Sequence, residues 1–361
     1  MWKANWAQTR QHFGNWWNHT GLVVGKWGSV SADRDVHAAA GAPPPAPATP
    51  QARACSAEFR AADNHYQLAR AVFPLDTLPL AYTNMGPGSL AAMLGSTPEF
   101  YPNTVWFPPV FADVDEPEQL PPLRFDADNE WWRVTEDYLR ACVARSGGNY
   151  LVPIPDLCEH ADILASLRGP ENLCVDLLER PAWVEQKITE INAAWLEVYN
   201  RVYDLVRQPD GSSAFCAFYL WGPGRTAKLQ CDLSAMLSGE MFRRFVVPAL
   251  EWQCARLDQT LYHLDGTQAL HHLDALLAID GLDAIEWTPQ AGIEQGGHPR
   301  WYELYRRILA AGKSVQIVGA ETAELAPLLD AIGPRGVYVI TPMRDEREAE
   351  QVARIVEPYY P

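Results

Sequence analysis

The sequence has no run of about 20 apolar residues, no Cys-x-x-Cys pair and no surplus of basic side chains. A membrane-spanning helix needs about 20 consecutive apolar residues, so none is expected. The chain carries 29 Lys and Arg against 45 Asp and Glu, a net charge of −16. Nucleic acids and anionic membranes bind basic surfaces, so we expect neither as a partner.

Features of a secreted protein are also absent. The first ten residues, MWKANWAQTR, contain no apolar stretch of the kind found in signal peptides. The seven cysteines are scattered and odd in number, which is typical of reduced thiols rather than of a disulfide framework. We therefore expect a cytoplasmic protein.

Hydrophobic residues make up 48% of the 361 residues, enough for one large core. From Leu78 onward, short apolar runs alternate with helical stretches, and this alternation predicts a (β/α)8 TIM barrel. The expected strands are 78–84, 149–156, 213–220, 228–232, 259–265, 283–288, 314–319 and 336–341, and clear helices are 131–144, 181–206, 240–257, 299–311, 323–331 and 345–355.

Two segments fall outside this alternation. Residues 85–148, between the first two expected strands, are too long for a simple loop, and we interpret them as an insertion that caps the site. Residues 1–54 are expected to be an N-terminal extension of a barrel domain spanning 55–361. Five tryptophans in its first 32 residues favour a helix and strand that cover the barrel floor or a subunit partner. The Ala/Pro-rich stretch 38–50 reads as an exposed linker.

The most informative stretch is 260–292, which reads as strand, helix, strand with polar residues where each strand ends. His263 and Asp265 are two apart in one strand and share a face, and the next strand can bring Glu286 alongside. Such nitrogen and oxygen donors suit Zn²⁺, Mn²⁺, Fe²⁺ or Co²⁺. Cys231, at another strand end, is a candidate fourth ligand. The alternative is a purely structural hydrogen-bonded pair of His263 and Asp265.

Further candidates follow the strand 149–156. Asp156 ends this strand and is a candidate acid, base or substrate anchor, although an Asp there also suits a helix N-cap. Arg168, on the helix that follows, can hold a substrate carboxylate or pair with Asp162 in the fold.

Four residues are candidate substrate contacts at other strand ends and loops. Asn84 opens an Asn-Met-Gly-Pro-Gly loop that could bind an anion through backbone N–H groups, although a turn explains the glycines alone. Tyr219 and Trp221 add aromatic surface that could stack on a planar substrate, with core packing as the alternative. His298 lies in a glycine-rich loop before a predicted helix.

Three blocks of sequence suggest a family. They are DLCEHADILASLRGPENLCVDLLERPAWV (156–184), CDLSAMLSGEMFRRFVVPAL (231–250) and Tyr-His-Leu-Asp-Gly (262–266) at a strand end. Residues 55–361 resemble the uroporphyrinogen decarboxylase superfamily, which includes zinc-dependent corrinoid and coenzyme M methyltransferases. The Asn-x-Trp-Trp motif at 129–132 looks like a poorly characterised branch of that superfamily.

The chain departs from the characterised branches in two places. It lacks the arginine-rich N-terminal motif with which the decarboxylases grip porphyrin carboxylates, so porphyrin decarboxylation is not expected. The methyltransferases carry His-x-Cys-Gly where this chain has His263-x-Asp265-Gly266, and a further Cys where it has Thr341-Pro-Met-Arg. His263 carries over directly, and Asp265 carries over by position.

What the resemblance implies is a metal-dependent enzyme, zinc being the foremost metal, that transfers a methyl group involving a small substrate. The methyl carrier would be a thiol or a corrinoid; because no Asp-x-His-x-x-Gly motif occurs, a corrinoid would be free or held by a partner protein. Barrels of this superfamily often pair, so we expect a homodimer. Alternatives are a decarboxylase or lyase using Asp156, Asp265 and Glu286 as acid/base groups, and a non-catalytic ligand-binding barrel.

Overall fold

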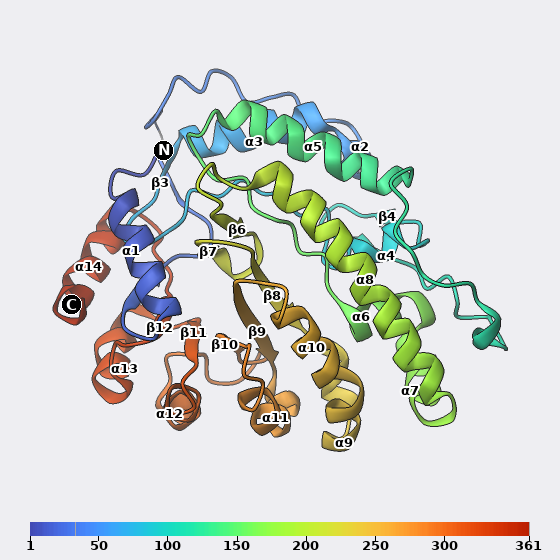
Figure 1. Ribbon diagram of the computed structural model, residues 1–361. Helices are drawn as coiled ribbons and strands as arrows, with labels where there is room; N and C mark the ends of the chain where they lie inside the picture. Colours follow the sequence, from blue (N-terminus) through green and yellow to red (C-terminus); the bar gives the residue numbers. More distant parts are fainter. Residues whose placement is uncertain (33, 361) are drawn as a thin grey trace.

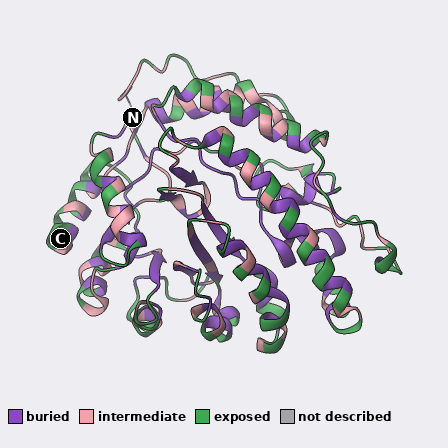
Figure 2. Ribbon diagram, in the orientation of Figure 1, coloured by how far each residue is buried: buried purple, intermediate pink, exposed green. Residues whose placement is uncertain are grey.

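The computed structural model describes residues 1–32 and 34–360 (Figure 1). Its centre is a sheet of six parallel strands in the order β1-β12-β11-β10-β9-β8. These strands are buried and the helices around them expose their outer faces (Figure 2). The strands are β1 (Leu22–Gly25), β8 (Thr226–Gln230), β9 (Gln259–Asp265), β10 (Ala284–Thr288), β11 (Ser314–Val318) and β12 (Val337–Ile340).

Short extended segments continue the wall from β1 round to β8. They replace the long strands expected at 78–84 and 149–156, and with β6 (Ser213–Phe215) they close the sheet. The expected α/β fold of TIM-barrel type is therefore confirmed. The links are Asp76 N to Val24 O, parallel bridges Leu80–Leu151 and Ile154–Phe215, and Thr226 N to Ser213 Oγ.

Helices surround this wall at close to the expected positions. The stretch expected as one helix at 240–257 instead contains a π-helical turn, Phe242–Val246, where Pro248 cannot donate a backbone hydrogen bond. The helices are α1 (Trp6–Trp17), α2 (Pro50–Cys55), α3 (Ala57–Ala69), α4 (Leu90–Met93), α5 (Glu130–Ser146), α6 (His160–Arg168), α7 (Pro170–Glu179), α8 (Pro181–Val206), α9 (Gly239–Met241), α10 (Val247–Cys254), α11 (Leu273–Leu277), α12 (Tyr302–Ala310), α13 (Leu325–Ile332) and α14 (Glu346–Val356).

Part of the N-terminal segment is built into the barrel wall, which would not be so for a separate extension. β1 is buried along its length and hydrogen bonds to β12, so residues before position 54 form part of the wall. Helix α1 covers the floor as expected: Trp16 Nε1 donates to Val315 O at 3.3 Å and Trp17 Nε1 to Trp221 O at 2.9 Å. The four residues of β1, Leu-Val-Val-Gly, were too short a pattern to be distinguished from the aromatic segment around them.

The strand expected at 213–220 is instead a hairpin. Phe218 and Tyr219 have φ of 57° and 52°, in the left-handed region, and the chain turns back there into β7 (Leu220–Gly222), antiparallel to β6. The tip is held inside the barrel, because Gln316 Nε2 donates to Phe218 O at 2.7 Å and the Tyr338 hydroxyl to Tyr219 O at 3.1 Å. The hairpin therefore fills the centre of the barrel.

The insertion at 85–148 packs on the outside of the wall. It contains α4, the hairpin of β4 (Glu99–Phe100) and β5 (Val105–Trp106), and α5, which lies beside α3 (Figure 1). Of the helices in the described part of the chain, none is long and apolar enough to cross a membrane.

Candidate functional site

Neighbouring strands bring polar side chains to one level of the barrel interior. Gln230 of β8 lies in register with His263 of β9, which in turn lies in register with Glu286 of β10. The register continues to Gln316 of β11 and Tyr338 of β12. Because neighbouring strands at the same register point equivalent side chains inward, these five residues form a polar layer across the barrel.

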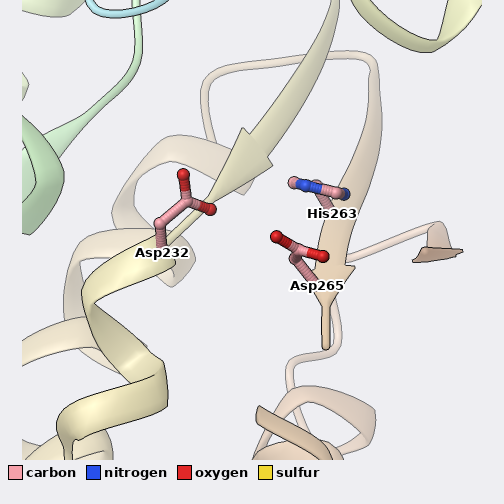
Figure 3. A group of neighbouring side chains, drawn as sticks. All are labelled: Asp232, His263 and Asp265. Atoms are coloured by element: carbon pink, nitrogen blue, oxygen red, sulfur yellow. The ribbon is translucent and has the colours of Figure 1, made fainter. Parts of the chain in front are cut away.

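Above this layer, three donor groups converge at the carboxyl ends of β8 and β9. One ligand atom from each of Asp232, His263 and Asp265 lies within 4.8 Å of the others. Figure 3 shows the Asp232 carboxylate turned toward His263 and Asp265, which project from the neighbouring strand. The expected convergence of His263 and Asp265 is therefore present, but the third member is Asp232, which the sequence did not single out.

Glu286 positions His263 rather than joining this group. Its Oε2 lies 2.5 Å from His263 Nδ1, and its Oε1 accepts a hydrogen bond from the Thr288 hydroxyl at 2.6 Å. Burial by itself would lower the pKa of His263, but the neighbouring Glu286 carboxylate outweighs it and the pKa is raised. With Nδ1 engaged, Nε2 is the ring nitrogen left for a ligand, an arrangement common around protein-bound metals.

Asp232 is held by groups from two other elements. Gln230 Nε2 donates to its Oδ2 at 3.1 Å, and the Asp162 carboxylate accepts the backbone N–H groups of Asp232 and Leu233 at 2.8 and 3.0 Å. Asp232 is exposed at its surface, but neighbouring protein around the carboxylate and the charge of Asp162 raise its pKa to about 6, with His263 acting in the opposite direction. Asp232 is therefore mainly ionised at neutral pH and can bind a cation.

Cys231, expected as a further ligand, is outside this group. Its side chain is buried, and burial raises the pKa of its thiol well above the usual range, with Asp162 and Asp232 adding to the rise. Strand β8 ends at Gln230 and a short 3-10 helix begins at Asp232, with Cys231 at its N-cap position.

Asp156 is the counterion of a lysine that the sequence reasoning missed. Lys228 is wholly buried, its Nζ lies 2.8 Å from Asp156 Oδ1, and it also hydrogen bonds to Gln230. Asp156 is not the N-cap of α6, a position that Glu159 occupies. A signal for Lys228 existed, since a lysine in the apolar run of a barrel strand must find a buried partner.

Arg168 serves the fold rather than a substrate. Its Nε donates to Asp176 Oδ2 at 2.7 Å, and its Nη1 donates to Phe111 O at 2.5 Å and Val114 O at 2.8 Å. The expected partner Asp162 instead anchors the turn at Asp232. Arg168 thus ties the insertion to α6 and α7.

The remaining candidates lie in different places. Trp221 is buried at the floor against Trp6, because the left-handed turn returns the chain to that end, and core packing accounts for it. His298 is exposed, and its Nδ1 accepts the Arg300 N–H at 3.2 Å as the cap of a short helix. Asn84 lies next to the Asp156 backbone, whose N–H its Oδ1 accepts at 2.8 Å.

A hollow of about 320 Å³ opens at the carboxyl ends of β1, β11 and β12. Trp27 lines it and packs edge-on against Phe218, whose ring centroid lies 4.6 Å from that of His263. Tyr219 also contacts Trp27, so this predicted substrate residue stays at the mouth. From the sequence, Trp27 was expected to cover the barrel floor or a subunit partner. In the structure it is 46% exposed beside a cavity.

Comparison with known proteins supports the fold. No protein-family model matches the chain, and no curated protein matches it by sequence. Among solved structures, the chain is similar to a methyltransferase from Methanosarcina mazei, with a TM-score of 0.61 and 12% sequence identity. The match covers 98% of this chain and 99% of that one. The two proteins therefore share one fold from end to end, as the sequence motifs led us to expect.

Proposed function

We propose that this protein is a metal-dependent enzyme that transfers a methyl group to or from a small substrate. The convergence of Asp232, His263 and Asp265 at the carboxyl ends of barrel strands carries the proposal. Two carboxylates balance the charge of a divalent cation, and one imidazole with two carboxylates is an N/O donor set that suits zinc, our first choice, or Mn²⁺ and Fe²⁺. The methyltransferase with the same fold supports the reaction class.

The chain's own residues would position both the metal and the substrate. When bound, a divalent cation supplies Lewis acidity, which lowers the pKa of a thiol or water. His263 would donate Nε2 while Glu286 fixes its ring, and Gln230 would orient Asp232. The Phe218 ring packs beside His263, and Trp27 packs edge-on against Phe218, so this side of the site is apolar.

The methyl carrier and its acceptor are predictions drawn from the resemblance. A corrinoid, free or on a partner protein, would deliver or receive the methyl group, and a small thiol would be its counterpart. Methylcobalamin with a simple thiol is the direct probe: methylation of the thiol by the zinc-loaded protein supports the proposal.

The decarboxylase alternative has less support from the geometry. Of the three carboxylates expected to do acid/base work, Asp156 is paired with Lys228 and Glu286 is bonded to His263. Asp156 and Glu286 are thereby engaged in positioning other groups. Asp265 is the one member of the three that is left for acid/base work. Turnover of any bound ligand would separate either enzyme from a non-catalytic barrel.

Metal content of purified variants tests the site. We expect wild type to bind about one zinc ion, His263→Ala to bind none and to lose activity, and Glu286→Gln to bind roughly 10- to 100-fold more weakly because the imidazole loses its orienting partner. His298→Ala is the matched control, since this exposed histidine lies outside the donor group. Asp265→Cys should strengthen the preference for zinc.

The melting temperature of the same variants is measured together with their metal content. His263→Ala leaves the buried Glu286 carboxylate without its hydrogen-bond partner, so some loss of stability is expected in either case, and the loss or retention of the metal separates a ligand from a structural histidine. A variant that loses about 1–3 kcal/mol of stability through the broken Glu286 hydrogen bond, yet keeps its metal, would show that His263 is structural.

A further inference from the structure

A second hollow, of about 370 Å³, lies on the outer side of the wall. Helices α2 and α3, the β4–β5 hairpin and the loop at 84–87 form its sides, and neither His263 nor the two aspartates beside it contribute. Its volume is within the range of small-molecule sites in proteins. The hollow is thus a separate cavity of ligand size.

A buried arginine without a counterion lines this hollow. Arg60 is 7% exposed, and its guanidinium lies 3.7 Å from the centroid of the Tyr138 ring. Nη1 donates to Ala54 O at 3.1 Å and Nη2 to Asn84 O at 2.7 Å. A guanidinium has five N–H groups, so about three have no acceptor among the described residues, and none of the described carboxylates forms a salt bridge with it.

An unpaired buried charge is costly, because burial removes the water that would otherwise solvate it. The backbone carbonyls and the Tyr138 ring offset part of this cost for Arg60, but neither carries a full negative charge. An anion entering the hollow would supply that charge together with acceptors for the remaining N–H groups. Arg60 is therefore arranged to receive an anionic group.

Aromatic side chains surround the cation. Phe59 and Phe100 line the hollow, and Tyr82 and Tyr101 line it while remaining 67% and 50% exposed. Tyrosines left this exposed at the rim of a cavity offer flat apolar faces that a planar ring can cover. The lining thus combines stacking surface with a fixed positive charge.

The charges on the walls limit the charge of the ligand. Arg53 and Arg60 contribute two positive charges and Asp63 one negative charge, so the lining carries a net charge of +1. A singly charged ligand is matched, whereas a doubly charged phosphate ester would leave one charge uncompensated near Asp63. We propose that this hollow is a binding site for a small aromatic monocarboxylate, with Arg60 as its anion-binding residue.

The hollow adjoins the interior through a single residue. Asn84 accepts the Arg60 hydrogen bond with its backbone oxygen, and its Oδ1 accepts the N–H of Asp156, the partner of Lys228. Asn84, predicted from the sequence as a substrate contact, therefore forms the wall between this hollow and the barrel.

Calorimetric titration with benzoate tests the proposal. We expect benzoate to bind wild type, while its neutral isostere benzamide, the ringless anion acetate and the dianion phenyl phosphate each bind at least about tenfold more weakly, a loss of roughly 1.4 kcal/mol. His263→Ala should bind benzoate as wild type does, which keeps this result independent of the metal site. Equal affinity for benzoate and benzamide would overturn the assignment to an anion.

Two substitutions locate the binding. Tyr82→Ala changes an exposed side chain and should weaken benzoate binding severalfold without affecting folding. Trp106→Ala, 60% exposed on the β4–β5 hairpin but outside the hollow, should leave benzoate binding unchanged. Arg60→Gln should abolish binding. Because Arg60 also holds the end of α2, its melting temperature is measured in parallel. Absence of benzoate binding in wild type, or binding that both Arg60→Gln and Tyr82→Ala leave intact, would refute the proposal.

Discussion

At the residue scale, the carboxylates around the barrel mouth are distinguished by their partners. Asp156 is paired with Lys228, Glu286 with His263, and Asp162 with the backbone of the turn after β8. Asp265 accepts no hydrogen bond from the residues that the structure describes, and Asp232 accepts one from Gln230. Among these five carboxylates, Asp265 and Asp232 thus accept the fewest hydrogen bonds, and these two converge with His263, as metal ligands should.

The strand pattern predicted part of this arrangement. His263, Asp265 and Glu286 were found because side-chain alternation and pairing between adjacent strands are local rules. Asp232 comes from a strand end far earlier in the chain, and ligand chemistry favoured its neighbour Cys231. Strand β8 ends at Gln230 and a 3-10 helix begins at Asp232, so strand alternation could not indicate which of the two side chains joins His263.

A buried histidine predicts how stability depends on pH. His160 is fully buried, its Nδ1 accepts the Ala161 N–H at 2.8 Å, and burial lowers its pKa to about 4, with Asp162 opposing and Lys228 adding to the shift. Because the unfolded state takes up a proton near pH 6.5 and the folded state does not, the contribution of His160 to stability falls as pH drops from about 6.5 to about 4. From about pH 7 to about pH 5 the loss should be about 2 kcal/mol.

Urea unfolding at the two pH values, on wild type and His160→Asn, measures this contribution. Asparagine is chosen because His160 has φ of 28°, in the left-handed region that asparagine tolerates. The variant should lose less stability on acidification than wild type, whereas His298→Asn, on the surface, should follow wild type. Identical pH dependence in His160→Asn and wild type would show that His160 does not titrate between the two states.

At the scale of elements, the strands that belong to the repeating strand–helix pattern could be predicted from the sequence. The irregular elements could not. Strands β9 to β12 fall within one or two residues of their expected bounds, because each is a short apolar run before a helix. β1 has four residues and a partner strand more than 300 residues away, and the β6–β7 turn depends on left-handed residues that are neither glycine nor asparagine. Neither feature leaves a local pattern that propensity can detect.

Truncation tests whether residues 1–54 are a dispensable extension. Removing them deletes β1 and α1, which exposes the edge of β12 and uncovers the floor, where Trp16 is fully buried. We expect residues 55–361 alone to lack a cooperative thermal transition in circular dichroism. A single proteolytic cut within the exposed 41–45 stretch is the control and should leave the transition intact. A truncated chain that unfolds cooperatively would instead support the domain boundary expected from the sequence.

At the scale of the whole molecule, the net charge and the buried tryptophans affect whether two chains can form the expected homodimer. The homodimer was expected from the resemblance and from apolar surface on the N-terminal segment. Trp16 and Trp17, the last two residues of α1, are instead buried against the barrel floor, so those two rings pack within one chain. The expectation of a homodimer therefore rests on the resemblance, and its energetics must include repulsion between two chains that each carry a net charge of −16.

That repulsion gives the dimer a characteristic salt dependence. Like-charged copies approach more easily when salt shortens the screening length, which falls from roughly 10 Å at about 0.1 M to about 3 Å at about 1 M. Light scattering at micromolar concentration should therefore give a mass near twice the 40.4 kDa of one chain, and the dimer fraction should rise with added sodium chloride. Dissociation on adding salt would mean that attractive ion pairs hold the interface, because screening weakens those as well. A mass of one chain at every salt concentration would show that the protein is a monomer and that the barrels do not pair.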